Sequence, residues 1–241
     1  MNEFNPFRSP VEVMAQVKDS TIKIAPAIKL AAYALLWLAL IAQIVWIVFE
    51  HFQRHAPLLS MAYPIAYVSL FFVLASTSGR IHWIATVLRL LIALSFLLPV
   101  ADRFGLLGGP GTPGVSWGDF AHFIAYTGQV NAFMARATIP TLAVLATIAE
   151  AALCLTMLLG IYTRASAIGS AALLFAYATA MTISGLSQFE YSVYLMCAGS
   201  LALAAVDASL FSVDALVRWR KRSLGEGEES FVPAVTESDR A

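Results

Sequence analysis

Charged residues are scarce in this chain. Only 12% of the 241 residues are Asp, Glu, Lys or Arg, against about 25% in a typical soluble domain, and 59% are hydrophobic. This balance, with a mean hydropathy of +0.76, excludes an ordinary soluble fold and indicates an integral membrane protein. Lys plus Arg and Asp plus Glu both number 15, so no basic excess predicts a nucleic-acid partner. The expected partner is the lipid bilayer.

Cysteines and familiar catalytic motifs are also scarce. The two cysteines, Cys154 and Cys197, lie inside apolar runs, which excludes a disulfide framework. Their spacing leaves open whether they pair, although a buried free cysteine usually packs as a small hydrophobe. The histidines are too scattered for a metal site, and the sequence has no phosphate loop, nucleophile elbow or haem attachment motif. We therefore expect neither a metal site nor a soluble type of active site.

Long apolar runs dominate what is present. Six runs approach the roughly 20 residues that a helix needs to cross the hydrocarbon core. They are 27–49, 57–77, 81–101, 138–162, 165–184 and 191–208. We predict an all-α polytopic membrane protein, with a four-helix transmembrane bundle at 81–208 preceded by two extra transmembrane helices at 27–77. A tight turn at Thr163 and Arg164 should make the fourth and fifth spans antiparallel neighbours.

Charges outside the spans predict the orientation. With both termini in the cytoplasm, only Arg54, Arg103 and Arg136 among the flanking basic residues lie on the opposite side. This bias suits a bacterial inner membrane. Residues 1–26 are expected to form an amphipathic cytoplasmic segment, and 209–241 a basic and then disordered cytoplasmic tail.

The loop 102–137 is external in this topology. It begins with the turn-rich stretch GLLGGPGTPG, which does not suit a helix, and continues with SWGDFAHFIAY. Ser116 and Asp119 are suitable caps for a helix lying at the membrane interface. The apolar residues expected on this segment are Trp117, Phe120, Phe123 and Ile124.

Polar residues in the last four spans recur at intervals of three or four, so each span carries one polar stripe. The stripes are His82, Thr86 and Arg89; Thr147, Glu150, Cys154 and Met157; Ser166, Ser170, Tyr177 and Ser184; and Cys197, Ser200 and Asp207. Four such helices should turn their stripes toward one another. The predicted intramembrane polar site consists of Arg89, Thr147, Glu150, Cys154, Tyr177 and Asp207, with Gly160 and Arg164 as a turn motif.

Glu150 is the costliest residue of this site. A charge at mid-membrane costs roughly 2.5 to 3.5 kcal/mol on insertion scales, so it needs a partner or a task. At ~1.5 Å per residue, Glu150 lies about 18 Å and Arg89 about 13 Å from the inner ends of their spans. A long arginine side chain covers the difference, which predicts an Arg89–Glu150 ion pair. Both a structural lock between helices and a functional site are consistent with this pair.

The run AEAALCLTMLLGIYTRASAI, with Glu150, Gly160 and Arg164, resembles the signature of the DoxX-like membrane proteins. Arg89 in VLRLLIALSF is similar to that family's pattern too. The resemblance covers about 81–208 and implies a four-helix membrane bundle. The chain departs from the pattern at the outer end of 81–101, where family members usually carry glycines and a lysine. The residues here are Ala93, Pro99, Asp102 and Arg103.

The resemblance implies a redox-associated membrane subunit, quinone-linked or thiol-linked, that belongs to an oxidoreductase complex and contacts protein partners there. A quinone headgroup would then lie at the stripe around Arg89, Glu150 and Tyr177. The alternative is a non-catalytic scaffold or assembly factor in which the Arg/Glu pair is a structural lock. Transport is the weaker third choice, because the sequence shows no obvious inverted repeat or pair of broken helices.

Overall fold

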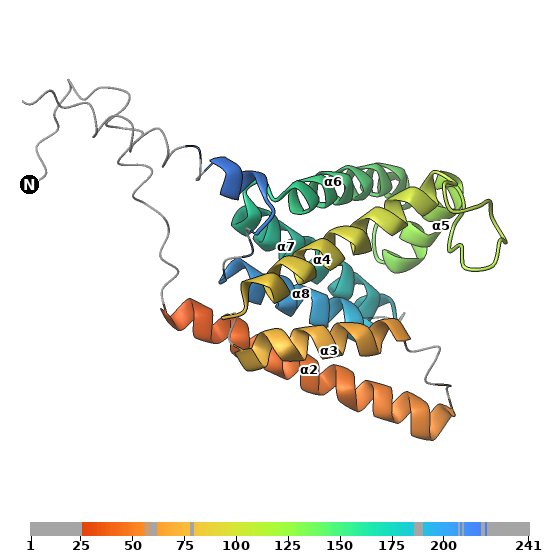
Figure 1. Ribbon diagram of the computed structural model, residues 1–241. Helices are drawn as coiled ribbons and strands as arrows, with labels where there is room; N and C mark the ends of the chain where they lie inside the picture. The colour runs from red at the N-terminus through yellow and green to blue at the C-terminus, as the bar shows by residue number, and fades with distance from the viewer. Residues whose placement is uncertain are drawn as a thin grey trace, which may run out of the picture.

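The structure is a computed structural model that describes residues 26–55, 57, 62–77, 80–185, 190–206, 208, 210–217 and 220. Within these residues the chain is helical and contains no strand (Figure 1). Four of the described helices are long and apolar enough to cross a membrane, and two shorter apolar helices accompany them. The predicted all-α polytopic membrane fold is therefore confirmed. The segment 1–26, apart from Pro26, and the tail beyond 220 lie outside the described residues.

The helices follow the six predicted runs, with one more helix in the loop between the third and the fourth. Their bounds are α2 Pro26–Arg54, α3 Ala62–Thr77, α4 His82–Arg103, α5 Phe120–Val130, the 3₁₀ turn η2 Arg136–Thr138, α6 Ile139–Leu159, α7 Thr163–Ser184 and α8 Glu190–Ala204. Two are shorter than predicted: α3 begins after Pro57, with Pro64 in its first turn where no helical hydrogen bond is lost, and α8 ends before residue 208. Two helices end later than predicted: α2 continues five residues beyond the predicted end at 49, and α4 continues two residues beyond the predicted end at 101.

Helices α4, α6, α7 and α8 form the predicted bundle, with α7 packed along α8 and α4 along α6. The α2–α3 hairpin lies beside this bundle, where α2 packs on α8 and α3 contacts both α4 and α8 (Figure 1). The core contains Leu36, Phe71, Leu88, Ile92 and Met157. Many large apolar side chains on the outside are exposed, as expected where a helix faces lipid rather than water.

The turn between α6 and α7 differs slightly from the predicted one. It lies at 160–162, where Gly160 (φ 67°) and Tyr162 (φ 47°) are left-handed, and Thr163 already begins α7. The Asp214 carboxylate accepts hydrogen bonds from the backbone N–H groups of Tyr162 and Thr163, at 3.0 and 2.9 Å. The hydroxyl of Thr163 donates to the same carboxylate at 2.6 Å. Asp214 thus satisfies the free amides at the start of α7.

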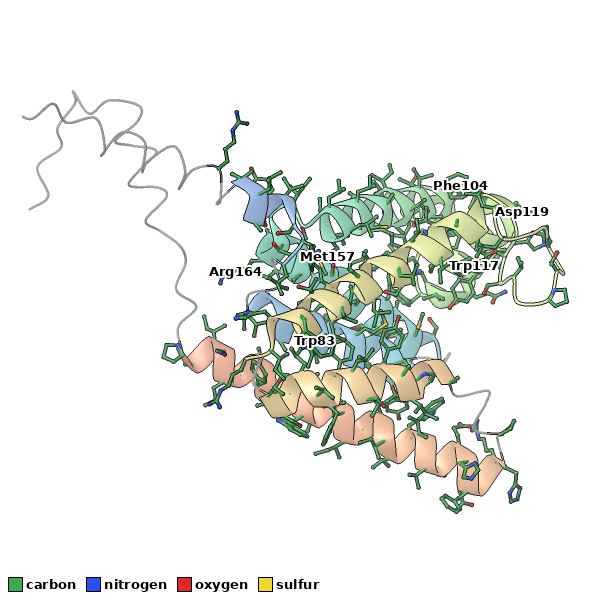
Figure 2. All side chains as sticks on the ribbon, viewed as in Figure 1. Trp83, Phe104, Trp117, Asp119, Met157 and Arg164 are labelled. Atoms are coloured by element: carbon green, nitrogen blue, oxygen red, sulfur yellow. The ribbon has the colours of Figure 1, made fainter. Side chains whose placement is uncertain are left out.

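Residues 210–217 therefore belong to the folded part of the chain, although the sequence placed them in the tail. Ser212 is buried, and the backbone N–H of Asp214 donates to the Gly160 carbonyl at 3.2 Å. Arg164 donates from Nε to the Ala204 carbonyl at 3.1 Å, which adds the end of α8 to the same assembly. The end of the bundle that holds Arg164 lies opposite the end that holds Asp119 (Figure 2).

The Gly160 turn generates a stability prediction. A Cβ at Gly160 would lie 2.2 Å from Ser212 Cβ and 2.5 Å from Arg89 Nη1, whereas a Cβ at Gly185, which has a similar φ of 70°, would meet nothing within 4 Å. Gly185→Ala should lose about 1 to 2 kcal/mol through backbone strain alone. Gly160→Ala should lose a further ~1 to 3 kcal/mol through the clash. Thermal unfolding in detergent measures both, and equal losses would contradict the packing of 210–217 over the turn.

Candidate functional site

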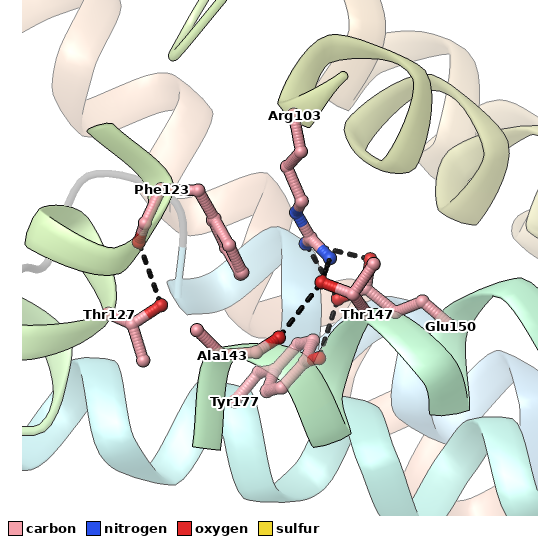
Figure 3. A network of polar contacts seen from close by, with 7 residues as sticks. All are labelled: Arg103, Phe123, Thr127, Ala143, Thr147, Glu150 and Tyr177. Carbon is pink, nitrogen blue, oxygen red and sulfur yellow. Dashed lines mark hydrogen bonds and ion pairs between the residues drawn. The ribbon is translucent and has the colours of Figure 1, made fainter. Parts of the chain in front are cut away.

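A buried ion pair joins α4 to α6. Arg103, the last residue of α4, and Glu150, in the middle of α6, are 3% and 2% exposed. Arg103 Nη2 lies 2.9 Å from Glu150 Oε1 and 2.8 Å from Oε2, and Nη1 donates to Thr147 Oγ1 at 2.9 Å (Figure 3). The guanidinium therefore contacts two residues one turn apart on the same face of α6.

The predicted Arg89–Glu150 pair is wrong. Arg89 is fully buried but donates from Nη1 to the Ala208 carbonyl at 2.9 Å and from Nη2 to the Phe211 carbonyl at 3.2 Å. Arg103 follows Arg89 by almost four helical turns, about 21 Å along α4, so the two side chains serve opposite ends of the bundle. The sequence estimate failed because it ended the span at 101 and counted depth only from the inner ends of the helices.

Tyr177 of α7 completes the cluster. Its hydroxyl donates to Glu150 Oε1 at 2.5 Å, and the Thr147 hydroxyl donates to the Ala143 carbonyl at 2.8 Å (Figure 3). The structure thus brings together Glu150, Thr147 and Tyr177, as the polar stripes predicted. We call these three residues with Arg103 the polar cluster.

The remaining predicted site residues lie elsewhere. Cys154 shares the buried face of α6 one turn beyond Glu150, and Cys197 donates from Sγ to the Ala171 carbonyl at 3.2 Å. Both cysteines are free, so the question that the sequence left open is answered: they do not pair. Gly160 lies at the α6–α7 turn, and Arg164 lies in the first turn of α7, from which its side chain reaches the end of α8; both are away from the polar cluster. Asp207 lies outside the described residues.

Two aromatic rings cover the Arg103 guanidinium. Its central carbon lies 3.6 Å from the centroid of the Phe123 ring and 5.3 Å from that of Trp117. Cation–π contacts of this kind stabilise a cation that has lost its water. Arg103 Nε nevertheless has no hydrogen-bond acceptor among the described residues. The Arg103–Glu150 ion pair is therefore neutral overall, but the N–H at Arg103 Nε makes no hydrogen bond to a described residue.

A second carboxylate holds the loop between α4 and α5 against this cation. Asp102 is 4% exposed and accepts hydrogen bonds from the backbone N–H groups of Ser116, Trp117 and Gly118, at 2.9, 3.1 and 3.1 Å. These bonds fix the loop so that the Trp117 ring lies over Arg103. Sequence reasoning missed both Asp102 and Arg103 because it treated them as exposed flanking charges. The departure from the family pattern at this end of the helix was the available signal.

The predicted N-cap of the loop helix α5 by Asp119 is confirmed. Asp119 is its N-cap, and its Oδ1 accepts from the backbone N–H of His122 at 2.8 Å. This bond, together with a second one to the His122 ring, lowers the pKa of the exposed Asp119 carboxyl. Ser116 does not cap the helix and instead donates its backbone N–H to Asp102. Phe123 faces inward from α5, which explains its contact with Arg103.

A cavity of about 500 Å³ borders the polar cluster. Arg103, Glu150 and Tyr177 form its polar wall, and Asn131 and Thr127 add a second small polar region. Most of the other lining side chains are apolar, among them Phe96, Leu142, Leu174, Val193 and Met196. Leu145, also in the lining, is 58% exposed, so the cavity reaches the outer surface of the bundle. Such a site suits an apolar molecule that carries a few oxygen atoms.

Comparisons with family models, curated proteins and solved structures give no match for this chain.

The ion pair generates a stability prediction. Arg103→Gln and Glu150→Gln should each lose about 3 to 5 kcal/mol, because each leaves a buried charge without its partner, and the double variant should lose clearly less than the sum. Chemical or thermal unfolding in detergent measures the cycle.

The control cycle pairs Arg89→Gln with Glu150→Gln. Because Arg89 and Glu150 share no hydrogen-bond partner, their losses should add within about 0.5 kcal/mol. Additivity between Arg103 and Glu150, with coupling between Arg89 and Glu150, would restore the pair that the sequence predicted.

The Asp102 carboxylate generates a prediction about the loop. Asp102→Ala should speed amide hydrogen exchange at Ser116, Trp117 and Gly118, because all three lose their acceptor. Asp119→Ala is the matched control and should speed exchange chiefly at His122 in α5. Unchanged exchange at 116–118 in the Asp102 variant would show that the carboxylate does not hold the loop.

Proposed function

We propose that this chain is a DoxX-like, redox-associated membrane subunit that binds a quinone headgroup in the cavity beside the polar cluster. One observation carries the proposal: an apolar cavity within the helix bundle has a single strongly polar wall, made by Arg103, Glu150 and Tyr177. A quinone has the matching chemistry, since its flat apolar ring carries carbonyl oxygens at its edges. The cavity also falls in the size range of about 300 to 1,000 Å³ that is typical of small-molecule sites.

The polar wall suits both redox forms of the ring. Arg103 Nε is buried and has no acceptor among the described residues, so a small shift of the side chain would turn its N–H toward a quinone carbonyl oxygen. Tyr177 donates its own proton to Glu150, so its hydroxyl oxygen remains an acceptor for a hydroquinone hydroxyl. Leu145 both lines the cavity and is exposed on the outer surface of the bundle, so a quinone could enter from the lipid at this point and leave its isoprenoid tail outside.

The polar cluster also offers a proton route. Reduction of a quinone to a hydroquinone takes up two electrons and two protons. In this proposal the protons reach the quinone oxygens through the Tyr177–Glu150 hydrogen bond, and a protein partner with a redox centre supplies the electrons. We favour this quinone-linked form over a thiol-linked one because Cys154 and Cys197 are 3% and 8% exposed.

The location that we propose is a bacterial inner membrane, with both termini in the cytoplasm. The distribution of Lys and Arg supports it, and so does the separation of Arg164 and the Asp119 loop at opposite ends of the bundle (Figure 2). Arg103, which the sequence counted as external, is buried in the bundle, so the external side carries even less positive charge.

The second candidate is a non-catalytic scaffold or assembly factor. It is favoured by the way the polar cluster joins three helices: Arg103 comes from α4, Thr147 and Glu150 from α6, and Tyr177 from α7. In that case the cluster is a structural lock, and its loss lowers stability without affecting any ligand.

Ligand analysis separates the two candidates. The chain purified in mild detergent should carry quinone detectable by mass spectrometry, and an added short-chain quinone should quench Trp117 fluorescence. Tyr177→Phe should weaken quinone binding by roughly tenfold, the effect of losing about 1.4 kcal/mol. Ala146→Phe should abolish binding, because Ala146 lines the cavity.

Ala152→Phe is the matched control, since Ala152 lies on the exposed side of the same helix and lines none of the described cavities. This variant should bind quinone normally. Folded protein that neither retains nor binds quinone would favour the scaffold. Equal quinone binding by Ala146→Phe and the parent chain would show that the quinone does not bind in this cavity.

A further inference from the structure

Two adjoining hollows lie on a different side of the bundle, between α2, α7 and α8. The first has a volume of about 570 Å³ and an almost wholly apolar lining that includes Leu38, Ile168 and Phe175. The second, of about 450 Å³, lies toward the end of α2 and includes Glu50 and Arg54 in its lining. The two share Ala42 and Tyr191, so we treat them as one continuous α2 groove. None of its lining residues belongs to the cavity beside the polar cluster.

The α2 groove opens toward lipid. Leu38, Phe175 and Ile168 in its lining are 66%, 57% and 50% exposed, although all are large and apolar. From Leu35 to Arg54 the groove follows α2 for about 28 Å, close to the ~30 Å thickness of the hydrocarbon core. This length accommodates an extended acyl chain below a headgroup.

Among the described residues that line it, the mouth of the groove carries one charge of each sign. Arg54 Nη1 lies 3.0 Å from Glu50 Oε1, and the two side chains are 60% and 14% exposed. Trp46 and Tyr191, whose ring centroids are 6.3 Å apart, line the same hollow. Aromatic residues of this kind mark the headgroup level of a membrane. The apolar part of the α2 groove thus ends at the membrane interface, where the Arg54 cation lies beside the Glu50 anion.

We propose that the α2 groove binds a phospholipid whose zwitterionic headgroup carries a primary amine, of the phosphatidylethanolamine type. The lipid phosphate contacts Arg54, its ammonium group donates to Glu50, and one acyl chain occupies the apolar hollow. Charge complementarity selects this headgroup. A choline headgroup has no N–H to donate to Glu50, and a glycerol headgroup carries a phosphate without a cation and faces the Glu50 carboxylate.

The test is a lipid titration of the full-length, delipidated protein, read by native mass spectrometry. The lipids are phosphatidylethanolamine, phosphatidylcholine and phosphatidylglycerol with identical acyl chains. The parent chain should bind phosphatidylethanolamine about tenfold more tightly than the other two. Glu50→Gln should remove this preference, because the headgroup ammonium loses its ionic acceptor.

Blocking the groove tests the position of the acyl chain. Ala42→Trp should reduce retention of phosphatidylethanolamine by about tenfold, since Ala42 lies where the two hollows join. Ala34→Trp is the matched control, because Ala34 is exposed on the same helix and lines neither hollow. Equal affinity of the parent chain for the three lipids, an unchanged preference in Glu50→Gln, or equal retention by both tryptophan variants would each overturn the proposal.

Discussion

The buried contact between Arg103 and Glu150 is the interaction on which this end of the bundle depends. A charge within a membrane is tolerated only when it is paired, and the pairing here draws in its surroundings. Thr147 and Tyr177 supply further hydrogen bonds to the same two groups, and Phe123 covers the cation. The loop between α4 and α5 is part of this arrangement, because it brings the Trp117 ring over Arg103, and the neighbouring Asp102 fixes its backbone.

At the opposite end of the bundle, arginine and aspartate side chains bind backbone groups. There Arg89 and Arg164 donate to backbone carbonyls beyond or at the end of α8, and Asp214 accepts from backbone amides at the start of α7. These charges satisfy free backbone groups at helix ends. They border none of the described cavities. A functional role is therefore better supported for the Arg103 end, where a charged cluster and a cavity coincide.

The sequence predicted what depends on composition and periodicity. Apolar runs located the helices, and helical spacing placed Thr147, Glu150, Cys154 and Met157 on one buried face. It failed for Arg103 because the length of α4, not the local pattern, decides how deep a terminal residue lies. The hydrogen bonds between Asp102 and residues 116–118 could not be predicted from the sequence either, because a contact across a glycine-rich loop produces no periodic pattern of residues. The α2 groove depends on how α2 packs against α7 and α8, which hydropathy does not report.

Structural and ligand-binding roles for the polar cluster are compatible, because they use different atoms. The ion pair uses Arg103 Nη2 and both Glu150 oxygens, whereas the proposed quinone would use the lone pairs of the Tyr177 hydroxyl and, after a small shift of the side chain, the buried Arg103 Nε. The pair is also neutral overall, which restricts what can bind. An anionic ligand would compete with Glu150 for Arg103, and a cationic one would compete with Arg103 for Glu150. A neutral ring with carbonyl or hydroxyl oxygens leaves the pair intact, and the quinone is such a ring.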